Sequence, residues 1–249
     1  MATIGIFDSG SGGLSVYREI VKLLPREHYL FFADNAHCPY GEKPASYIQD
    51  RARTITDILS GLGAEVIVVA CNTATAAAIA TLRAAYPALP FIGMEPAVKP
   101  AALGTKSGVI GVLATAGTLK GSKYLKTRGQ FEDNVRIVEH VGEGFVELVE
   151  RGILDGAEAE KVVRASVEPL LDEGADILVL GCTHNPFRRP LIERIAGPGV
   201  QVIDPAPAVA RHTVHVLRES GIPTGDGPFR IDLYSSGSPD SLRRIFSLL

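Results

Sequence analysis

The chain has few cysteines, and they are not arranged like those of a disulfide-rich or zinc-binding domain. Its 249 residues contain three cysteines, Cys38, Cys71 and Cys182. A sparse and odd set does not fit the disulfide framework of a small secreted protein. None of the three belongs to a C-x-x-C pair, so a zinc knuckle is not expected either. We therefore expect reduced thiols in a cytosolic protein.

Charge and hydropathy argue against several other classes. Charged residues make up 21% of the chain and the net charge is -3, so nucleic acid is not an expected partner. No basic segment followed by an apolar run begins at Met1, so no signal peptide is expected. The best apolar run is interrupted by Asn72, Thr73 and Thr75, which argues against a membrane span. We expect a cytoplasmic protein that binds a small molecule.

Short apolar runs alternate with longer helical patterns along the chain. Hydrophobic residues make up 46%, enough for one large α/β domain or two small ones. The runs are apolar on both faces, as in parallel strands covered on both sides, so the alternation predicts doubly wound parallel sheets. The predicted strands are residues 3–7, 29–33, 66–70, 91–93, 108–113, 135–139, 177–180, 201–203 and 230–234. Four clear helical patterns cover residues 46–61, 75–85, 157–173 and 206–220.

The sequence repeats itself weakly. "GAEVIVVACNT" begins at Gly63 and "GADILVLGCTH" at Gly174, and the offset of 111 also separates Cys71 from Cys182. Any two buried strands before helices look alike, but the shared lead-in and cysteine favour a true repeat. We predict two pseudo-symmetric α/β lobes of flavodoxin-like or Rossmann-like type, residues 1–95 with 206–249 and residues 96–205, with the active site in the interlobe cleft. The tail returns to the first lobe because its strand has no obvious partner in the second.

The stretch "FDSGSGG" follows the first predicted strand and opens a helix. Such a loop offers free backbone N–H groups to an anion, although it lacks the lysine of a phosphate-binding Walker loop. Asp8 would repel phosphate there and would suit an ammonium group or an acid–base partner. It could equally be an ordinary helix cap. In "ADNAHCPYGEK", Asp34 is either functional or a cap, and the PYG loop could bring backbone donors to the same edge.

Cys71 and Cys182 lie beyond the carboxyl ends of predicted strands, which is where ligands bind in such sheets. Each is expected to begin a helix whose N-terminus helps to form a thiolate. A lone cysteine at this position is usually a small buried hydrophobe, but two in matched settings point to chemistry. Two thiols facing one cleft could serve a nucleophilic hydrolase, a redox pair, or inversion at a carbon with one base on each face.

Several motifs in their order along the chain resemble the glutamate racemase family. They are "IGIFDSGSGGLSV", "DNAHCPYGEK", "VVACNTA", "GMEPAVKPA", "GVLATAGT" and "VLGCTHNP". The paired C-N-T and C-T-H motifs are typical of the cofactor-independent aspartate/glutamate racemase superfamily. The DSG and PYG motifs point within it to glutamate racemase.

The resemblance implies a two-base racemisation of glutamate with no cofactor and no metal, which supplies D-glutamate for peptidoglycan. Cys71 would deprotonate the D form and Cys182 the L form, with Asp8 and His184 as their respective partners. The expected substrate contacts are Asp8, Ser9, Tyr40, Gly41, Asn72, Thr73, Thr183 and His184.

Further expectations concern neighbouring residues. Thr115 and Thr118 are expected to add contacts, and Glu150 is either a supporting residue or an exposed helix carboxylate. Asn185 departs from the family pattern, which commonly has an apolar residue there, and Cys38 is an extra thiol beside the PYG loop. We also expect a homodimer and no N-terminal extension of the kind that some members use for activation.

Three other functions remain open from the residues. The nearest is a racemase for aspartate or another acidic amino acid. The second is a phosphate-binding enzyme built on "DSGSGG", and the third is a non-catalytic module that binds acidic amino acids in the same cleft.

Overall fold

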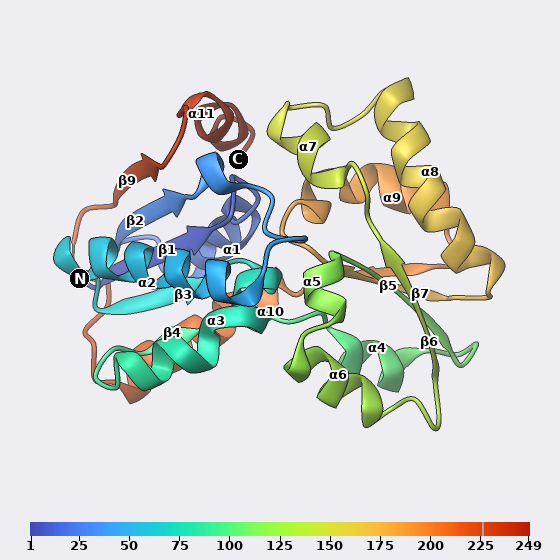
Figure 1. The fold of residues 1–249 in the computed structure, drawn as a ribbon, viewed down its shortest axis with the longest axis horizontal. Coiled ribbons are helices and arrows are strands. Elements are labelled where there is room, and N and C mark those ends of the chain that lie inside the picture. The colour runs from blue at the N-terminus through green and yellow to red at the C-terminus, as the bar shows by residue number, and fades with distance from the viewer. Residues whose placement is uncertain (226) are drawn as a thin grey trace.

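The computed structural model describes residues 1–225 and 227–249 and distributes the strands over two parallel sheets (Figure 1). The first sheet has the order β4-β3-β1-β2-β9 and the second the order β6-β5-β7-β8. The strands of the first are β1 (Thr3–Asp8), β2 (His28–Ala33), β3 (Val66–Val69), β4 (Phe91–Ile92) and β9 (Arg230–Ser235). Those of the second are β5 (Val109–Ala114), β6 (Arg136–Val141), β7 (Ile177–Gly181) and β8 (Gln201–Ile203). The predicted fold class is confirmed.

Helices cover both faces of each sheet because the strands are apolar on both sides. In the first lobe, α1 and α10 pack on one face and α2 and α3 on the other. In the second lobe, α8 and α9 pack opposite α4 and α6. The helices of the first lobe are α1 (Leu14–Leu23), η1 (Asn35–His37), α2 (Ala45–Gly61), α3 (Asn72–Ala85), α10 (Ala206–Glu219) and α11 (Asp240–Phe246). Those of the second are α4 (Val98–Gly104), α5 (Ala116–Leu119), α6 (Ser122–Gly129), α7 (Phe145–Glu150), α8 (Ala157–Asp172), η2 (Asn185–Arg188) and α9 (Arg189–Ala196).

The two lobes repeat one topology. β1 lies between β2 and β3, and β5 lies between β6 and β7 in the same way. Ile4 pairs with Val66 in the first sheet, and Ile110 pairs with Ile177 in the second. The strand order reverses between β1 and β3 and again between β5 and β7, and ligands bind in such crevices. Each lobe therefore has one such crevice, at the carboxyl ends of its strands.

The end of the chain returns to the first lobe. After β8 the chain forms α10, which packs on α1, and β9, which pairs with β2. Figure 1 shows β9 in red at the outer edge of the first sheet, and α11 contacts α7 of the second lobe. We propose boundaries at residues 1–95 with 206–249 and at residues 96–205.

The prediction that Cys182 begins a helix is wrong. Cys71 is the N-cap of α3, and its carbonyl accepts the Thr75 N–H at 2.8 Å. The residue 111 positions after Thr75 is Pro186, which has no N–H to close that turn. The chain instead bends at Cys182, forms the short η2, and begins α9 at Arg189. The second cysteine therefore lacks the helix N-terminus that the first has.

None of the helices within residues 1–225 and 227–249 is both long and apolar enough to span a bilayer.

Candidate active site

The carboxyl ends of the two sheets border one cavity between the lobes. Its empty volume is about 270 Å³, of which about 10 Å³ admits the centre of a water molecule. The cavity therefore has room for about one water molecule. Its lining from the first lobe is Ser9, Pro39, Tyr40, Gly41, Cys71, Asn72 and Thr73, and its lining from the second lobe is Thr115, Val146, Cys182, Thr183 and His184.

All but one of the ten residues predicted for catalysis or substrate contact line this cavity. The exception is Asp8, which is fully buried and is not among the lining residues. Thr115 lines the cavity as expected, and Thr118 lies behind it, hydrogen-bonded to Thr115. Sequence reasoning did not find Val146, whose apolar side chain carries no chemical signal.

Cys71 is held at the end of β3 by two polar contacts. Its Sγ accepts the Ala74 N–H at 3.4 Å, and its S–H donates to Ser9 Oγ at 3.7 Å. Burial and the Asp8 carboxylate raise the pKa of Cys71 well above its usual range, although the Ala74 N–H acts against them. The expected thiolate at the helix N-terminus is therefore not favoured in the resting site, because desolvation outweighs the helix dipole. Cys71 rests as a neutral thiol.

Asp8 lies between the two lobes' polar groups. Its Oδ2 accepts the Gly13 N–H at 2.8 Å and the Thr183 hydroxyl at 3.4 Å. Burial raises the pKa of Asp8, although His184 and the Gly13 N–H act in the opposite direction. Asp8 therefore accepts a backbone N–H at the start of α1, as a helix cap would. Its raised pKa also makes it suited to exchange a proton with Cys71.

Cys182 is linked through His184 to Glu150. The Cys182 Sγ lies 3.8 Å from His184 Nδ1, and His184 Nε2 lies 2.8 Å from Glu150 Oε1. Burial alone would lower the pKa of His184, but its hydrogen bonds with Cys182 and Glu150 outweigh burial and hold it well above its usual range. The imidazole is therefore cationic beside Cys182, in the position where a helix N-terminus is missing.

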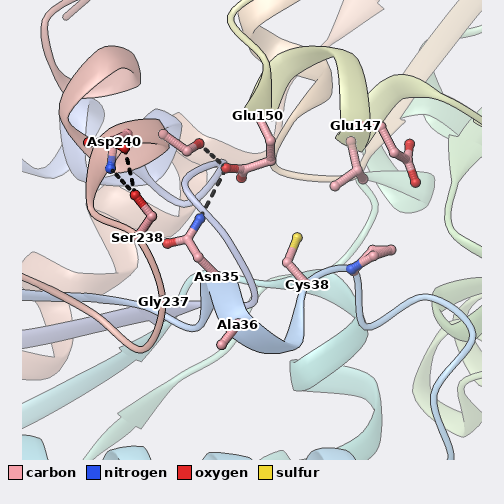
Figure 2. A pocket seen from close by; sticks show the side chains of 11 residues that line it. Asn35, Ala36, Cys38, Glu147, Glu150, Gly237, Ser238 and Asp240 are labelled. Carbon is pink, nitrogen blue, oxygen red and sulfur yellow. Dashed lines mark hydrogen bonds between the residues drawn. The ribbon is translucent and has the colours of Figure 1, made fainter.

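Glu150 is a supporting residue rather than an exposed helix carboxylate. Its Oε1 accepts the Ser11 N–H at 2.5 Å and its Oε2 accepts the Asn35 amide at 3.1 Å. Figure 2 shows the Asn35 amide bonded to Glu150, and the Ser241 hydroxyl also donates to this carboxylate. Burial raises the pKa of Glu150, but its hydrogen bonds, chiefly to His184, lower it to about 2. Glu150 thus ties the second lobe to the first.

The cavity is also lined by polar side chains that could form hydrogen bonds with a ligand. Neither atom of the Asn72 side-chain amide has a hydrogen-bond partner among the described residues, and Asn72 is only 4% exposed. Hydroxyls of Thr73 and Thr115 meet across the lobes at 2.8 Å, and Thr118 lies 2.9 Å from Thr115. A buried amide without a partner is costly unless a ligand satisfies it.

The PYG loop is held in place from below. The Tyr40 hydroxyl donates to Asp34 Oδ2 at 2.5 Å, and Arg51 of α2 grips both oxygens of the same carboxylate at 2.8 and 3.0 Å. Burial alone would raise the pKa of Asp34, but Arg51 and Tyr40 lower it. Asp34 therefore supports the loop. Asn185 also has a structural contact, because its amide donates to the Leu113 carbonyl of β5 at 3.1 Å.

The arrangement places one thiol from each lobe on a shared cavity. Two such groups can take a proton from one side of a bound carbon atom and deliver one to the other. A family model described as Asp/Glu/Hydantoin racemase matches residues 4–213. The chain is also 48% identical over 249 residues to the glutamate racemase of Stutzerimonas stutzeri (strain A1501), an alignment that covers 100% of this chain and 94% of that protein. The chain belongs to the glutamate racemase family.

Solved members of the glutamate racemase family have the same fold. The Escherichia coli enzyme, in complex with L-glutamate and the activator UDP-MurNAc-Ala, superposes with a TM-score of 0.87 at 31% identity. It covers 99% of this chain and 93% of its own. The Francisella tularensis enzyme in complex with D-glutamate gives 0.84 at 28% identity, with 99% and 92% covered. The resemblance stated from the motifs is confirmed, and so is the predicted class of enzyme, a racemase and hence an isomerase.

Proposed function

We propose that the chain interconverts L- and D-glutamate by proton transfer between two thiols, without a cofactor. The observation that carries this proposal is that Cys71 and Cys182, from opposite lobes, line one cavity. The family membership and the substrates of the solved relatives support glutamate over aspartate.

In the L-to-D direction, Cys182 acts as the base. The cationic His184 beside its Sγ places positive charge where the thiolate must exist. Cys182 removes the α-proton of L-glutamate, and the neutral thiol of Cys71 delivers its proton to the opposite face. One thiol and one thiolate are present before and after the step, so the site ends with their roles exchanged.

In the D-to-L direction, Cys71 must first lose its proton. Asp8 lies beside Cys71 and takes that proton, and the raised pKa of Asp8 makes it a stronger base than an ordinary carboxylate. The His184 imidazolium gives a proton to Cys182. Cys71 then removes the α-proton of D-glutamate, and the Cys182 thiol donates its proton to the opposite face. Asp8 and His184 are thus the proton partners of the first and second thiol.

Polar groups of the cavity match an amino acid with two carboxylates. The Asn72 amide offers a donor for a carboxylate and an acceptor for the ammonium group. The hydroxyls of Thr73, Thr115 and Thr118 bond to one another, and Thr115 Oγ1 also accepts the Thr118 N–H at 3.3 Å. These hydroxyls would turn to a substrate carboxylate. Ser9, Tyr40, Gly41, Thr183 and His184 complete the proposed contact set.

Substrate entry requires the lobes to separate. The space open to a water molecule is far smaller than glutamate, and the lobes are joined by the Ser15 hydroxyl to the Thr183 carbonyl at 2.9 Å and by the Gly117 N–H to the Gly41 carbonyl at 2.9 Å. A closed site also excludes water, which strengthens the charge interactions at the reacting carbon. We place this enzyme in the cytoplasm, supplying D-glutamate for peptidoglycan, and a homodimer stays a prediction.

Deuterium exchange at the α-carbon tests the proposal. Each glutamate enantiomer is incubated separately with the protein in heavy water and chelator, and circular dichroism and proton NMR follow the optical signal and the α-proton. We expect both to reach the racemate with deuterium at the α-carbon. Cys38→Ser should behave as wild type, while Cys71→Ser and Cys182→Ser should not racemise. An unchanged optical signal would instead indicate a binding module, and faster exchange of aspartate would indicate the other substrate.

A further inference from the structure

We propose that Cys38, Glu150 and His184 form a site at which a thiol-seeking divalent cation such as Zn²⁺ binds and inhibits the enzyme. The sulfur, one carboxylate oxygen and one ring nitrogen all lie within 4.8 Å of one another. Among residues 1–225 and 227–249, this is the one group of three cysteine, histidine or acidic side chains with that spacing. Cys38 has no part in the proposed proton transfers.

Other features of the structure also show that these groups face one another. A Cβ added to Gly10 would lie 2.4 Å from Glu150 Oε1 and 2.9 Å from Cys38 Sγ, so both atoms border the same small space. Figure 2 shows the Cys38 sulfur directed toward Glu150. His184 Nε2 is already 2.8 Å from Glu150 Oε1. A cation placed between them would exchange that hydrogen bond for two metal bonds.

The ligand set favours zinc among the common cations. One thiolate, one imidazole and one carboxylate suit Zn²⁺, which takes nitrogen, sulfur and oxygen ligands in a tetrahedron and leaves a fourth position for water. Ligand atoms around zinc are about 3.5 Å apart. The separations in this cluster are at most 4.8 Å, and that between His184 Nε2 and Glu150 Oε1 is 2.8 Å, so zinc could bind after small side-chain movements.

The net charge of the three-residue cluster is the same before and after the cation binds. Burial and the nearby Glu150 carboxylate raise the pKa of Cys38, so the metal-free cluster holds a neutral thiol, a carboxylate and the cationic His184. Binding releases one proton from the thiol and one from the imidazolium, and one divalent cation replaces them. The net charge of the buried cluster therefore does not change, which removes the main cost of burying an ion.

The cation has a route that avoids the glutamate cavity. A second cavity with an empty volume of about 780 Å³ borders the cluster, and both Cys38 and Glu150 line it together with the start of α11 (Figure 2). A metal bound at Nε2 would replace the hydrogen bond between His184 and Glu150. It would also join Cys38 of the first lobe to two residues of the second, so the lobes could not separate to admit glutamate. This inhibitory effect depends on the proposed function, whereas metal binding itself does not.

Metal titrations of four matched proteins test the site. Co²⁺ alone, as a coloured substitute for zinc, is titrated into wild type, Cys38→Ser, Cys71→Ser and Cys182→Ser. Absorption from thiolate-to-cobalt charge transfer and calorimetry with Zn²⁺ give the binding. We expect one site per chain in wild type and in the Cys71 and Cys182 variants, and binding weaker by more than about 100-fold in Cys38→Ser.

Activity provides the second readout. Zn²⁺ should inhibit wild type, with full recovery in chelator, and Cys38→Ser should retain its metal-free activity and resist the same zinc concentration. The proposal is overturned if the thiolate–cobalt absorption persists in Cys38→Ser, or disappears in Cys71→Ser or Cys182→Ser. It is equally overturned if wild type binds no metal, or if zinc inhibits Cys38→Ser as strongly as wild type.

Discussion

Glu150→Gln removes one negative charge from the buried pair that joins the lobes and leaves the side-chain shape unchanged. Burial acts to raise the pKa of Glu150, but hydrogen bonds to His184, Ser241 and Ser11 outweigh it and lower the pKa from 4.5 to about 2. Each pKa unit corresponds to about 1.4 kcal/mol, so the ionised carboxylate stabilises the folded chain by about 3 kcal/mol at neutral pH. The variant should lose a free energy of unfolding of that order.

The sign of the pH dependence follows from the direction of the shift. Because the folded pKa lies below the unfolded one, the stabilisation is complete above pH 4.5 and disappears as the pH falls toward about 2. Glutamine cannot ionise, so the variant lacks this contribution at every pH. The difference in unfolding free energy between wild type and Glu150→Gln should therefore shrink between pH 4.5 and about 2.

Urea unfolding at several pH values measures this difference. Glu147→Gln is the matched control, since Glu147 lies on the same helix with an exposed side chain, and its substitution should change stability by less than about 0.5 kcal/mol. NMR titration of His184 is a second readout, and its pKa should fall in Glu150→Gln. A variant as stable as wild type near neutral pH, or a difference that stays constant with pH, would refute the ion pair.

Three further changes test other parts of the site. Gly12→Ala would place a Cβ 2.4 Å from His184 Nδ1, and displacing the ring by about 1 Å should lower kcat about 100-fold, while Gly61→Ala, which meets nothing within 4 Å, should not. Asn72→Ala removes an amide that has no partner among residues 1–225 and 227–249, and it should raise KM for both glutamate enantiomers about tenfold, with stability unchanged or higher. An unchanged KM would contradict its contact with substrate. Dialysis against chelator should leave activity intact and the pure protein should show no visible absorption; loss of activity that metal restores would argue for a metal cofactor.

The fold was predictable because its signals are local. Strands such as β3 and β7 are buried on both faces and appear in the sequence as continuous apolar runs. The repeat between them follows from the matched cysteines, and each lies at the end of its strand. Hydrophobic spacing does not show the bend after Cys182. The signal for it is Pro186, whose missing N–H interrupts the helical turn and which is visible in the sequence.

The site was predictable only where a motif marks it. Cys71 and Cys182 stand in recognisable contexts, and the structure brings them to one cavity. The contacts of Glu150 join residues far apart in the sequence, 139 positions from Ser11 and 91 from Ser241, so no local signal shows them. Burial of Asp8 behind the cavity is likewise a property of the packed lobes, and the short loop around it gives no indication of depth.

The two-thiol proposal is tested most directly by half-reactions of single cysteine variants. A glutamate analogue with a leaving group at the β-carbon needs only one base, because loss of the α-proton expels that group. Cys71→Ser keeps Cys182 and should eliminate from the L analogue but not from the D analogue, and Cys182→Ser should do the reverse. Ammonia release after hydrolysis of the eliminated product measures the rates. If either variant processes both enantiomers equally, one residue serves both faces and the two-base account is wrong.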